Sequence, residues 1–359
     1  MTGARGSILL LVAAFSLPLR LSSQTEVPAG FRELLKIDVH SHIFEYIPGF
    51  EDFLRENNLR LVNICVPATD SVEMKWQEEF AELSHLHFGK LHPFASTFPV
   101  YDVFKPGWSQ RAIAWLDDSY EQGAVMTKIW KEVGMELKTP TGEFMMPDDP
   151  VLDPVYDHLA RLGKPLIAHL AEPIMAWQPL REGDSMSYYG RHPEWHFYGR
   201  KDVPSWEQII RARDHILEKH PDLIFIGAHL GSMSHDVDLV AERLERFPNF
   251  YGEIGGRIPL MLDQSKEKLR AFFIRYQDRI MYGSDIARLP GESGLLMKEQ
   301  RAAYFASELD RYLRDYRFLA LAGEISYRNR KVQALGLPVE VLEKIYSRNA
   351  LRIIPGLED

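Results

Sequence analysis

The chain has 359 residues, of which 45% are hydrophobic and 26% are charged. These values are ordinary for a globular protein and exclude collagen-like, low-complexity and intrinsically disordered classes. The lone cysteine, Cys65, excludes an intrachain disulfide and a cysteine-based metal site, so a transition metal would need imidazole and carboxylate ligands. The net charge of −9 argues against nucleic acid and anionic membranes as partners and favours a small-molecule substrate, with a homodimer as one conceivable assembly.

The first 23 residues have the features of a secretory signal peptide. Arg5 gives a positive start, residues 8–15 form an apolar run, and Ser22 and Ser23 are small residues that suit a cleavage site. The run is shorter than the ~20 apolar residues that a membrane-spanning helix needs. We therefore expect cleavage near residue 23, no membrane span afterwards, and export to the periplasm or outside the cell. An uncleaved signal anchor is the alternative.

Beyond this leader, short apolar runs alternate with amphipathic helical stretches. Most of the runs are continuously apolar, which is typical of parallel strands that are covered on both faces. Eight strands are predicted, at Leu35–Ile43, Leu59–Val66, His92–Phe98, Ala124–Trp130, Pro165–Leu170, Leu223–His229, Phe250–Ile254 and Arg279–Ser284. Helices are predicted between them, at Ser71–Leu86, Ser109–Gln122, Asp153–Leu162, Ser205–Lys219, Asp236–Phe247 and Gln264–Gln277. This alternation predicts an α/β fold, a (β/α)₈ TIM barrel, in which residues 30–359 form one domain.

Two segments are longer than ordinary loops of such a barrel. Glu172–Pro204 follows the fifth predicted strand and is rich in aromatic residues. Ile286–Pro338 follows the eighth and contains a helical stretch at Ala302–Leu319. Because loops that follow barrel strands lie at the catalytic face, we expect both segments to cover an active site. Simple packing of the aromatic side chains on the barrel is the alternative.

Two histidines stand two residues apart at the end of the first predicted strand, in Ile37-Asp38-Val39-His40-Ser41-His42. Side chains at i and i+2 of a strand share a face, and one face of each barrel strand points to the barrel axis. Buried imidazoles need polar partners, so a shared metal ion would explain the pair. Two hydrogen-bonded surface histidines would give the same pattern.

Three more polar residues follow apolar runs in the same position. His169 ends the fifth run, His229 ends the sixth, and Asp285 follows the eighth. Barrel enzymes build their sites from residues at several strand ends, so we expect these side chains to converge. Imidazoles and a carboxylate suit Zn²⁺, with Mn²⁺ or Fe²⁺ as alternatives.

The sequence resembles the amidohydrolase superfamily, in particular the branch that includes aminocarboxymuconate-semialdehyde decarboxylase and related metal-dependent hydrolases. The resemblance extends over nearly all of the chain after the leader. It rests on the opening Asp38-Val39-His40-Ser41-His42, the strand-end residues, and the closing Ile345-Tyr346-Ser347-Arg348-Asn349-Ala350-Leu351-Arg352. It implies one divalent metal ion held by His40, His42, His169 and Asp285, with His229 as an acid/base or carbonyl-polarising group.

These roles are chemically consistent. A divalent ion lowers the pKa of bound water and can polarise a carbonyl. Asp285 is placed to accept a proton from that water and to return it to the leaving group. His229, if it is not a ligand, could hydrogen-bond a developing oxyanion.

Lys128 ends the fourth predicted strand and has three candidate roles. We expect an unmodified lysine that binds a substrate carboxylate. The resemblance also allows a carboxylated Lys128 that bridges two metal ions, with His229 as a further ligand, although the nearest branch is mostly mononuclear. A structural ion pair with Glu253 is the third role.

Other residues near the predicted rim are secondary candidates. Arg257 follows two glycines and could bind an anion, although a surface ion pair is its default role. Trp130, Trp177 and Tyr189 could stack on a substrate ring or could simply pack. The other histidines considered are expected to be structural or solvated, with His196 singled out for inspection; they are His85, His87, His92, His192, His196, His215, His220 and His235.

The sequence therefore predicts a metal-dependent hydrolase of a small carboxylated or cyclic substrate, such as a lactone, an ester or an amide, acting through metal-activated water. The alternative reaction is non-oxidative decarboxylation of an unsaturated or aromatic acid, because the same ligands would serve it. A binding barrel without turnover is a third reading, which the presence of both His229 and Asp285 disfavours.

Overall fold

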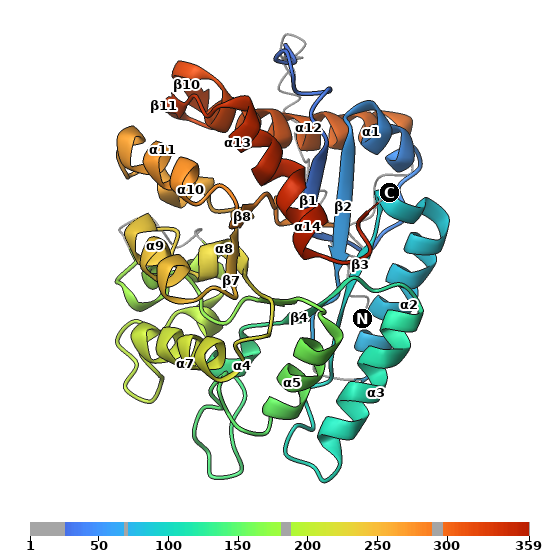
Figure 1. Ribbon diagram of the computed structural model, residues 1–359, viewed down its shortest axis with the longest axis vertical. Helices are drawn as coiled ribbons and strands as arrows, with labels where there is room; N and C mark the ends of the chain where they lie inside the picture. The colour runs from blue at the N-terminus through green and yellow to red at the C-terminus, as the bar shows by residue number, and fades with distance from the viewer. Residues whose placement is uncertain (1–25, 68–70, 181–187, 289–296, 359) are drawn as a thin grey trace, which may run out of the picture.

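The computed structural model describes residues 26–67, 71–180, 188–288 and 297–358. Its main feature is a curled parallel sheet with the strand order β8-β7-β6-β5-β4-β3-β2-β1-β9 (Figure 1). The strands are β1 (Lys36–Ile43), β2 (Leu59–Ile64), β3 (Phe94–Thr97), β4 (Met126–Ile129), β5 (Leu166–Ala168), β6 (Phe225–Gly227), β7 (Phe250–Glu253), β8 (Ile280–Met281) and β9 (Ile286–Arg288). All eight predicted strands are present, and most are shorter than predicted.

The sheet closes on itself where β8 and β9 meet β1. Ser41, His42 and Ile43 of β1 are in register with β9. The backbone N–H of Val39 donates to the Tyr282 carbonyl at 3.1 Å, and that of Asp285 donates to the His40 carbonyl at 2.8 Å. These contacts join the last strands to the first, so the predicted TIM barrel is confirmed.

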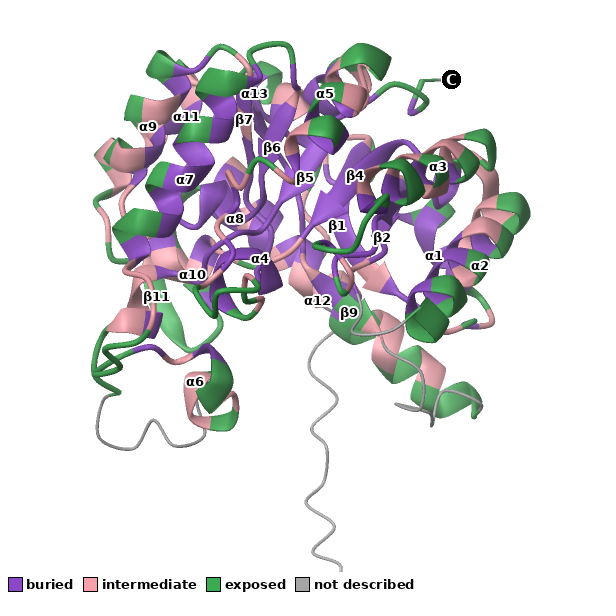
Figure 2. Cartoon of the chain, turned by 90° about the horizontal axis from the view of Figure 1, so that it is seen from below, coloured by how far each residue is buried: buried purple, intermediate pink, exposed green. Residues whose placement is uncertain are grey.

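The longer helices cover the outside of the sheet and turn their buried faces toward it, whereas the short α6 lies apart from the sheet and has no buried residue (Figure 2). The helices are α1 (Phe50–Glu56), α2 (Ser71–Phe88), α3 (Trp108–Glu121), α4 (Glu132–Met135), α5 (Asp153–Leu162), α6 (Tyr188–Arg191), α7 (Trp206–Lys219), α8 (Ala228–Gly231), α9 (Val237–Arg246), α10 (Ile258–Met261), α11 (Lys266–Arg275), α12 (Lys298–Ala320), α13 (Val339–Glu343) and α14 (Asn349–Ile353). Local signals set several ends. The Ser205 hydroxyl caps α7 by accepting the Gln208 N–H, and Gly163 ends α5 in the left-handed conformation with φ 63°.

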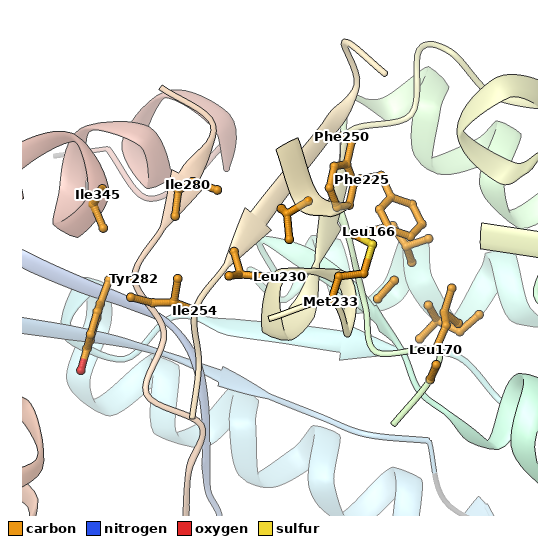
Figure 3. Close-up of a cluster of buried hydrophobic side chains, with 14 of the residues drawn as sticks. Leu166, Leu170, Phe225, Leu230, Met233, Phe250, Ile254, Ile280, Tyr282 and Ile345 are labelled. Atoms are coloured by element: carbon orange, nitrogen blue, oxygen red, sulfur yellow. The ribbon is translucent and has the colours of Figure 1, made fainter. Parts of the chain in front are cut away.

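Successive strand residues divide between two apolar clusters. Leu166, Phe225 and Ile280 pack outward in the larger cluster, part of which Figure 3 shows with Leu230, Met233 and Phe250. Ile167 and Ile226, their chain neighbours, belong to the smaller cluster, which joins residues of seven strands and therefore fills the barrel interior. This alternation is the period-2 pattern of strands, and it leaves the residues at the strand ends free for polar chemistry.

The segment after β8 differs from the cover loop that the sequence suggested. After β9 the segment forms the long helix α12, which includes the predicted helical stretch Ala302–Leu319. Tyr312, Leu313 and Leu319 of this helix are buried. An unpredicted antiparallel hairpin follows, made of β10 (Ala322–Tyr327) and β11 (Arg330–Leu335).

The predicted leader at residues 1–23 lies outside the described residues, and so do 181–187 and 289–296 of the two long segments. No helix in the described part of the chain has the length and apolar character needed to cross a membrane.

The C-terminal segment fixes the short strand β8. The Asn349 amide donates to the carbonyls of Gln277 and Ile280, both at 2.7 Å, and the Tyr282 N–H donates to the Ile345 carbonyl at 2.8 Å. Ile353 and Leu357 then join the interior cluster. The closing motif of the sequence is therefore structural: it holds β8, and with it the chain that leads to Asp285.

We expect the Asn349→Ala substitution to lower the free energy of unfolding by about 1–3 kcal/mol, because it removes the donor of the buried Ile280 carbonyl and of the partly buried Gln277 carbonyl. Chemical denaturation followed by circular dichroism measures this change. The control is Arg348→Ala, which removes only a surface ion pair with Glu343 and should change stability by less than about 0.5 kcal/mol. Equal effects of the two substitutions would show that the Asn349 amide does not hold β8.

Candidate metal centre

The two histidines of β1 reach the same point by means of an irregularity in the strand. Val39 packs in the barrel interior, so strict alternation would turn His40 outward. The register between β1 and β2 shifts between Asp38 and Ser41, however, and such a bulge re-aims side chains. The His40 and His42 rings lie 5.1 Å apart, and their Nε2 atoms lie 3.6 and 3.8 Å from Asp285 Oδ1.

Asp285 lies just beyond β8 and faces both rings. Its backbone has φ 57°, a left-handed conformation that non-glycine residues rarely adopt. Gly256 lies close to this carboxylate, since a Cβ on that glycine would come 3.2 Å from Asp285 Oδ2. The Asp285 side chain is 29% exposed, whereas that of His40 is 1% exposed. The carboxylate is thus the part of this group that solvent and a substrate can reach.

His229 follows β6 in a turn with four consecutive left-handed residues, since φ is 60° at His229, 57° at Leu230, 61° at Gly231 and 64° at Ser232. The turn stacks the His229 ring on that of His40 at 4.9 Å and places its Nε2 3.9 Å from Asp285 Oδ2. A left-handed non-glycine residue costs of order 1–3 kcal/mol. Such strain clusters at functional sites, and here it occurs at both His229 and Asp285.

His169 lies next to His229. Its ring meets the His229 ring edge-on at 4.5 Å, and its backbone N–H donates to the Ile129 carbonyl at 3.1 Å. His169 Nε2 is buried and has no hydrogen-bond partner among the described residues. A buried ring nitrogen without a hydrogen-bond partner is available as a ligand for a metal ion.

Three of the four rings are held in one tautomer. The Nδ1–H of His40 donates to Glu253 Oε1 at 2.8 Å, that of His42 to the Ile64 carbonyl at 2.8 Å, and that of His229 to the Gly255 carbonyl at 2.7 Å. Because each Nδ1 faces an oxygen acceptor, each Nε2 carries the lone pair. Metal-binding histidines are commonly oriented by such a second hydrogen bond.

The donor set of this site fits a divalent cation. Two groups of three residues in the described structure have ligand atoms within 4.8 Å of one another: one is His40, His42 and Asp285, the other is His40, His229 and Glu253. The second group is the poorer choice, since Glu253 Oε1 already accepts the Nδ1–H of His40. The first group uses the Nε2 atoms of both rings, of which that of His40 lies 3.3 Å from Lys128 Nζ. His169 belongs to neither group. Because its ring lies next to that of His229, it would have to complete the predicted ligand set from that position.

Burial also keeps these imidazoles in the form that binds metals. It holds the pKa of His40, His169 and His229 well below the usual value, and the nearby cation of Lys128 acts in the same direction on all three. The rings are therefore neutral at physiological pH, as ligation requires.

Glu253, at the end of β7, organises the site. It is fully buried, and its carboxylate accepts hydrogen bonds from His40 Nδ1 at 2.8 Å, from the His229 N–H at 2.6 Å, and from the Gly255 N–H. A Cβ on Gly255 would come 2.6 Å from Glu253 Oε2, and one on Gly283 would collide with the same oxygen. Both glycines therefore make room for this carboxylate.

Sequence reasoning considered Glu253 only as an ion-pair partner of Lys128. In the structure no direct ion pair joins these two residues, although the Glu253 carboxylate is the main charge that favours protonated Lys128. The signal that could have revealed the Glu253 role is a carboxylate at a strand end among glycines, in Gly252-Glu253-Ile254-Gly255-Gly256.

Asp38 performs a similar task between β1, β8 and α12. Its carboxylate accepts the N–H groups of His40 at 3.0 Å and Ser284 at 2.9 Å, the Ser284 hydroxyl, and the Tyr312 hydroxyl at 2.6 Å. Burial raises the pKa of Asp38 to about 7 in spite of these donors. Asp38 thus fixes the backbone on both sides of the His40–Asp285 contact.

Two cationic side chains lie next to the site. Lys128, at the inner end of β4, is buried with its Nζ 3.3 Å from His40 Nε2, and burial lowers its pKa to about 8. Arg257, in the turn after β7, has its Nη1 3.9 Å from Asp285 Oδ2. Both are therefore placed to attract an anion to the predicted centre.

The aromatic candidates do not gather around the imidazoles. Trp130 meets Trp195 edge-on at 5.5 Å, and Trp177 donates its Nε1–H to the Pro204 carbonyl at 3.0 Å. The Tyr189 hydroxyl donates to Glu172 Oε2 at 3.0 Å, and Glu172 also pairs with Lys131, which lies 3.9 Å from the centre of the Trp195 ring. Sequence reasoning missed this buried pair of Lys131 and Glu172, although Lys131 directly follows the predicted strand Ala124–Trp130, because only the fold brings the two residues together.

The remaining histidines make structural contacts. His92 Nδ1 bonds the Ser84 hydroxyl at 2.7 Å, and His220 and His215 each face an aspartate carboxylate at 2.8 Å. His196 stacks on Tyr189 at 6.0 Å and bonds the Gln178 carbonyl through Nε2 at 2.9 Å, so it orders the loop after β5.

Comparison with known proteins gives the fold and the family. Among solved structures, 2,6-dihydroxybenzoate decarboxylase from Rhizobium is 12% identical over 89% of this chain and 98% of its own, with a TM-score of 0.52. The 5-carboxyvanillate decarboxylase LigW from Sphingomonas paucimobilis is 13% identical over 89% and 99%, with a TM-score of 0.51. A putative 2-pyrone-4,6-dicarboxylic acid hydrolase from Pseudomonas putida is 14% identical over 91% and 99%, also with a TM-score of 0.51.

No curated protein matches the sequence. The family model described as amidohydrolase matches residues 103–356, which is well over half of the chain. The match begins beyond the His40 and His42 motif, which the fold itself brings to Asp285. This protein therefore belongs to the amidohydrolase family, as its sequence motifs predicted.

Proposed function

We propose that this protein is a metal-dependent hydrolase that acts on a small carboxylated or cyclic substrate, such as a lactone, an ester or an amide. The observation that carries the proposal is the arrangement of His40, His42 and His229, whose Nε2 atoms face the Asp285 carboxylate while oxygen acceptors hold each Nδ1–H. One divalent cation suits this donor set, with Zn²⁺ first and Mn²⁺ or Fe²⁺ as alternatives.

The proposed ligands are His40, His42, His169 and Asp285, and the Lewis acidity of the cation would make water more acidic and a carbonyl more electrophilic. Asp285 has a second role, because its carboxylate is partly exposed. It would accept the proton of the attacking water and deliver it to the leaving group. The left-handed backbone at Asp285 supports this role, since it turns the carboxylate toward the imidazoles.

The tautomer of His229 refines its proposed role. Neutral His229 donates its Nδ1–H to Gly255, so its Nε2 can accept a proton but cannot donate one to an oxyanion. His229 is therefore better suited to act as a base, or as a further ligand, than as the oxyanion donor suggested by the sequence alone. It would donate a hydrogen bond only after taking up a proton during the reaction.

Lys128 and Arg257 are the proposed binding residues for a substrate carboxylate. With a pKa of about 8, Lys128 is mainly protonated at pH 7 and is available for an anion. A carboxylated Lys128 that bridges two cations needs the neutral amine instead, so we keep it as the alternative. Trp130 remains a candidate for ring contact at the edge of the site.

Non-oxidative decarboxylation is the second candidate reaction. The observation that favours it is the position of Lys128 Nζ, 3.3 Å from a proposed ligand atom, because a cation there would hold a carboxylate directly beside the metal ion.

The leader-like sequence of residues 1–23 supports the further proposal that the protein works outside the cytoplasm, in the periplasm or the medium.

The two reactions are distinguished by their products. We expect the purified, metal-loaded protein to open lactones or cleave esters or amides in a panel of carboxylated substrates, with acid release measured by pH-stat. Release of CO₂ from aromatic or unsaturated acids, measured in the same samples, would instead select decarboxylation. Retention of activity after complete removal of metal by a chelator would contradict both.

The metal centre itself makes a separate prediction. We expect about one divalent ion per chain by elemental analysis, lost in a His40→Ala/His169→Ala double variant. Glu253→Gln should weaken metal binding by about 10–100-fold, since it removes the carboxylate that orients His40. The control is Glu78→Gln. This substitution alters a buried glutamate of α2, which is distant in sequence from Glu253, and it should leave metal affinity unchanged. Unchanged affinity in Glu253→Gln would show that the Glu253 carboxylate does not tune the site.

The titration of Lys128 gives a pH dependence. Its pKa in the folded protein is lowered to about 8, so the ammonium that attracts a carboxylate is present below this value and is lost as the pH rises through it. We expect the KM for a carboxylated substrate to rise above pH 8, and the KM for a neutral substrate to change little. Lys128→Gln should abolish the difference.

A carbamate on Lys128 that bridges two metal ions predicts instead that the site gains metal above pH 8. Metal content would then increase toward two ions per chain at pH values above 8 in bicarbonate, because the neutral amine reacts with CO₂.

A further inference from the structure

A cavity of about 180 Å³ lies between the end of β1 and the helices α1 and α2. On the side of the sheet its wall includes Ile43, which packs in the cluster outside the barrel and not in the interior cluster. The cavity is therefore separate from the candidate metal centre, although Ile43 directly follows the proposed ligand His42.

The size and the walls of this cavity suit one six-membered ring. A dry cavity of about 150 Å³ lined by aliphatic and aromatic side chains is large enough to bind benzene. The Phe50 ring meets the Phe88 ring edge-on at 5.7 Å and the His92 ring edge-on at 5.3 Å, so the wall offers ring faces and edges to a further ring. The apolar wall is formed mainly by Ile43, Ile47, Phe50, Phe80, Leu83 and Phe88.

The cavity opens to solvent between the loop after β1 and α2. Tyr46 and Leu83 both line it, and both are largely exposed, whereas Ile43 and Ile47 are buried. At this opening the Tyr46 ring meets the ring of His87, which is also exposed, at 6.3 Å. Large apolar side chains that are exposed around an apolar hollow are typical of a binding site. A small molecule can therefore enter from this side.

Two polar residues of the wall are buried and form one hydrogen-bonded pair. The Ser84 hydroxyl and His92 Nδ1 lie 2.7 Å apart, and the two residues are 8% and 1% exposed. The second ring nitrogen of His92, Nε2, is buried and has no hydrogen-bond partner among the described residues. An unsatisfied buried nitrogen is unfavourable, so a ligand that bonds it gains affinity. A hydroxyl suits both tautomers, because it can donate to a bare nitrogen or accept from an N–H.

The charges around the cavity favour a neutral ligand. Burial lowers the pKa of His92 to about 3, so its ring is uncharged at physiological pH. The Glu45 carboxylate, which also lies in the wall, accepts a hydrogen bond from Arg288 Nε at 2.8 Å. None of the described residues that line the cavity is a lysine or an arginine, so a carboxylate ligand would lose its hydration without gaining such a cation.

We propose that this cavity is a second binding site of the protein and takes a small neutral aromatic molecule with one hydroxyl group, that is, a phenol. The volume fits the ring, the aromatic wall fits its faces and edges, and the hydroxyl bonds His92. The inference does not depend on the proposed function, because the lining includes none of the proposed metal ligands. It assigns a ligand to the outer side of the loop that follows His42.

The test is a titration of the purified, metal-loaded protein with phenol, followed by NMR of labelled isoleucine and leucine methyl groups. We expect the signals of Ile43, Ile47 and Leu83 to shift and to saturate together, because a bound aromatic ring changes the magnetic field at neighbouring methyl groups. The signals of Leu86, an exposed residue of the same helix that does not line the cavity, should stay in place. Benzoate should bind there at least about tenfold more weakly than phenol, because its charge must be desolvated.

A matched pair of leucine variants locates the binding. Leu83→Glu places a carboxylate at the opening and should weaken phenol binding by about tenfold. Leu86→Glu makes the same change on the same helix outside the cavity and should leave the affinity unchanged. Both residues are exposed, so neither variant is expected to disturb folding. His92→Phe should weaken phenol binding by about tenfold and leave toluene binding unchanged, since only phenol loses a hydrogen bond.

Saturation by phenol without shifts at Ile43 and Ile47, or equal affinities in Leu83→Glu and Leu86→Glu, would overturn the inference. Benzoate binding as tightly as phenol would do the same, and so would a His92→Phe effect that is equal for phenol and toluene. Shifts of the same methyl signals with protein concentration alone would place a side chain of a second copy in the cavity, and this result would also contradict the proposal.

Discussion

The site depends on one buried carboxylate, that of Glu253. Its two oxygens accept hydrogen bonds from an imidazole of β1, from the backbone of the turn after β6, and from the backbone of the turn after β7. An uncompensated buried charge would be very unfavourable, so these donors must stay in place. Glu253 therefore joins strand β1 and the turns after β6 and β7 into one unit, and it fixes which nitrogen of His40 carries the hydrogen.

Rigidity of this kind explains how the chain tolerates strain where the chemistry is expected. His229 and Asp285 both have left-handed backbones, which are unfavourable for their residue types. The His229 N–H is held by Glu253, and the turn that contains His229 is further bound by Arg213, which donates to the Gly231 carbonyl at 2.8 Å. The chain before Asp285 is held by Asp38 through Ser284. Two buried carboxylates thus stabilise two strained residues that lie only 3.9 Å apart.

The barrel, the strand order and the positions of the polar strand ends could be predicted from the sequence, because they follow from continuous apolar runs and from regular alternation with helices. The convergence of His40, His42, His229 and Asp285 followed from that architecture. The prediction that His40 lies beside His42 was correct, but the period-2 pattern of a strand is not its full reason. The position of His40 also depends on a bulge in β1, which that pattern does not include.

Other parts of the site could not be predicted because they depend on tertiary contacts. The role of Glu253 depends on His40 of β1 and on the turn after β6, which are distant from it in sequence, and glycine spacing alone does not identify these partners. The β10–β11 hairpin has mostly exposed residues, so it lacks the apolar alternation that marks a buried strand. Lys131 and Glu172 likewise carry no local pattern, and only the fold brings them together.

The closure of the barrel has a consequence for how the chain folds. The first strand pairs with β2 on one edge, but its other edge is completed only by residues near Tyr282 and Asp285, and Ile353 and Leu357 join the interior from the C-terminal segment. Contacts of such long sequence separation slow folding, because a large loop must be ordered before they form. A nascent chain on the ribosome cannot complete this barrel until almost all of it has been synthesised. The proposed metal ligands His40, His42 and Asp285 would thus come together in the last steps of folding, so that an incomplete chain lacks the complete site.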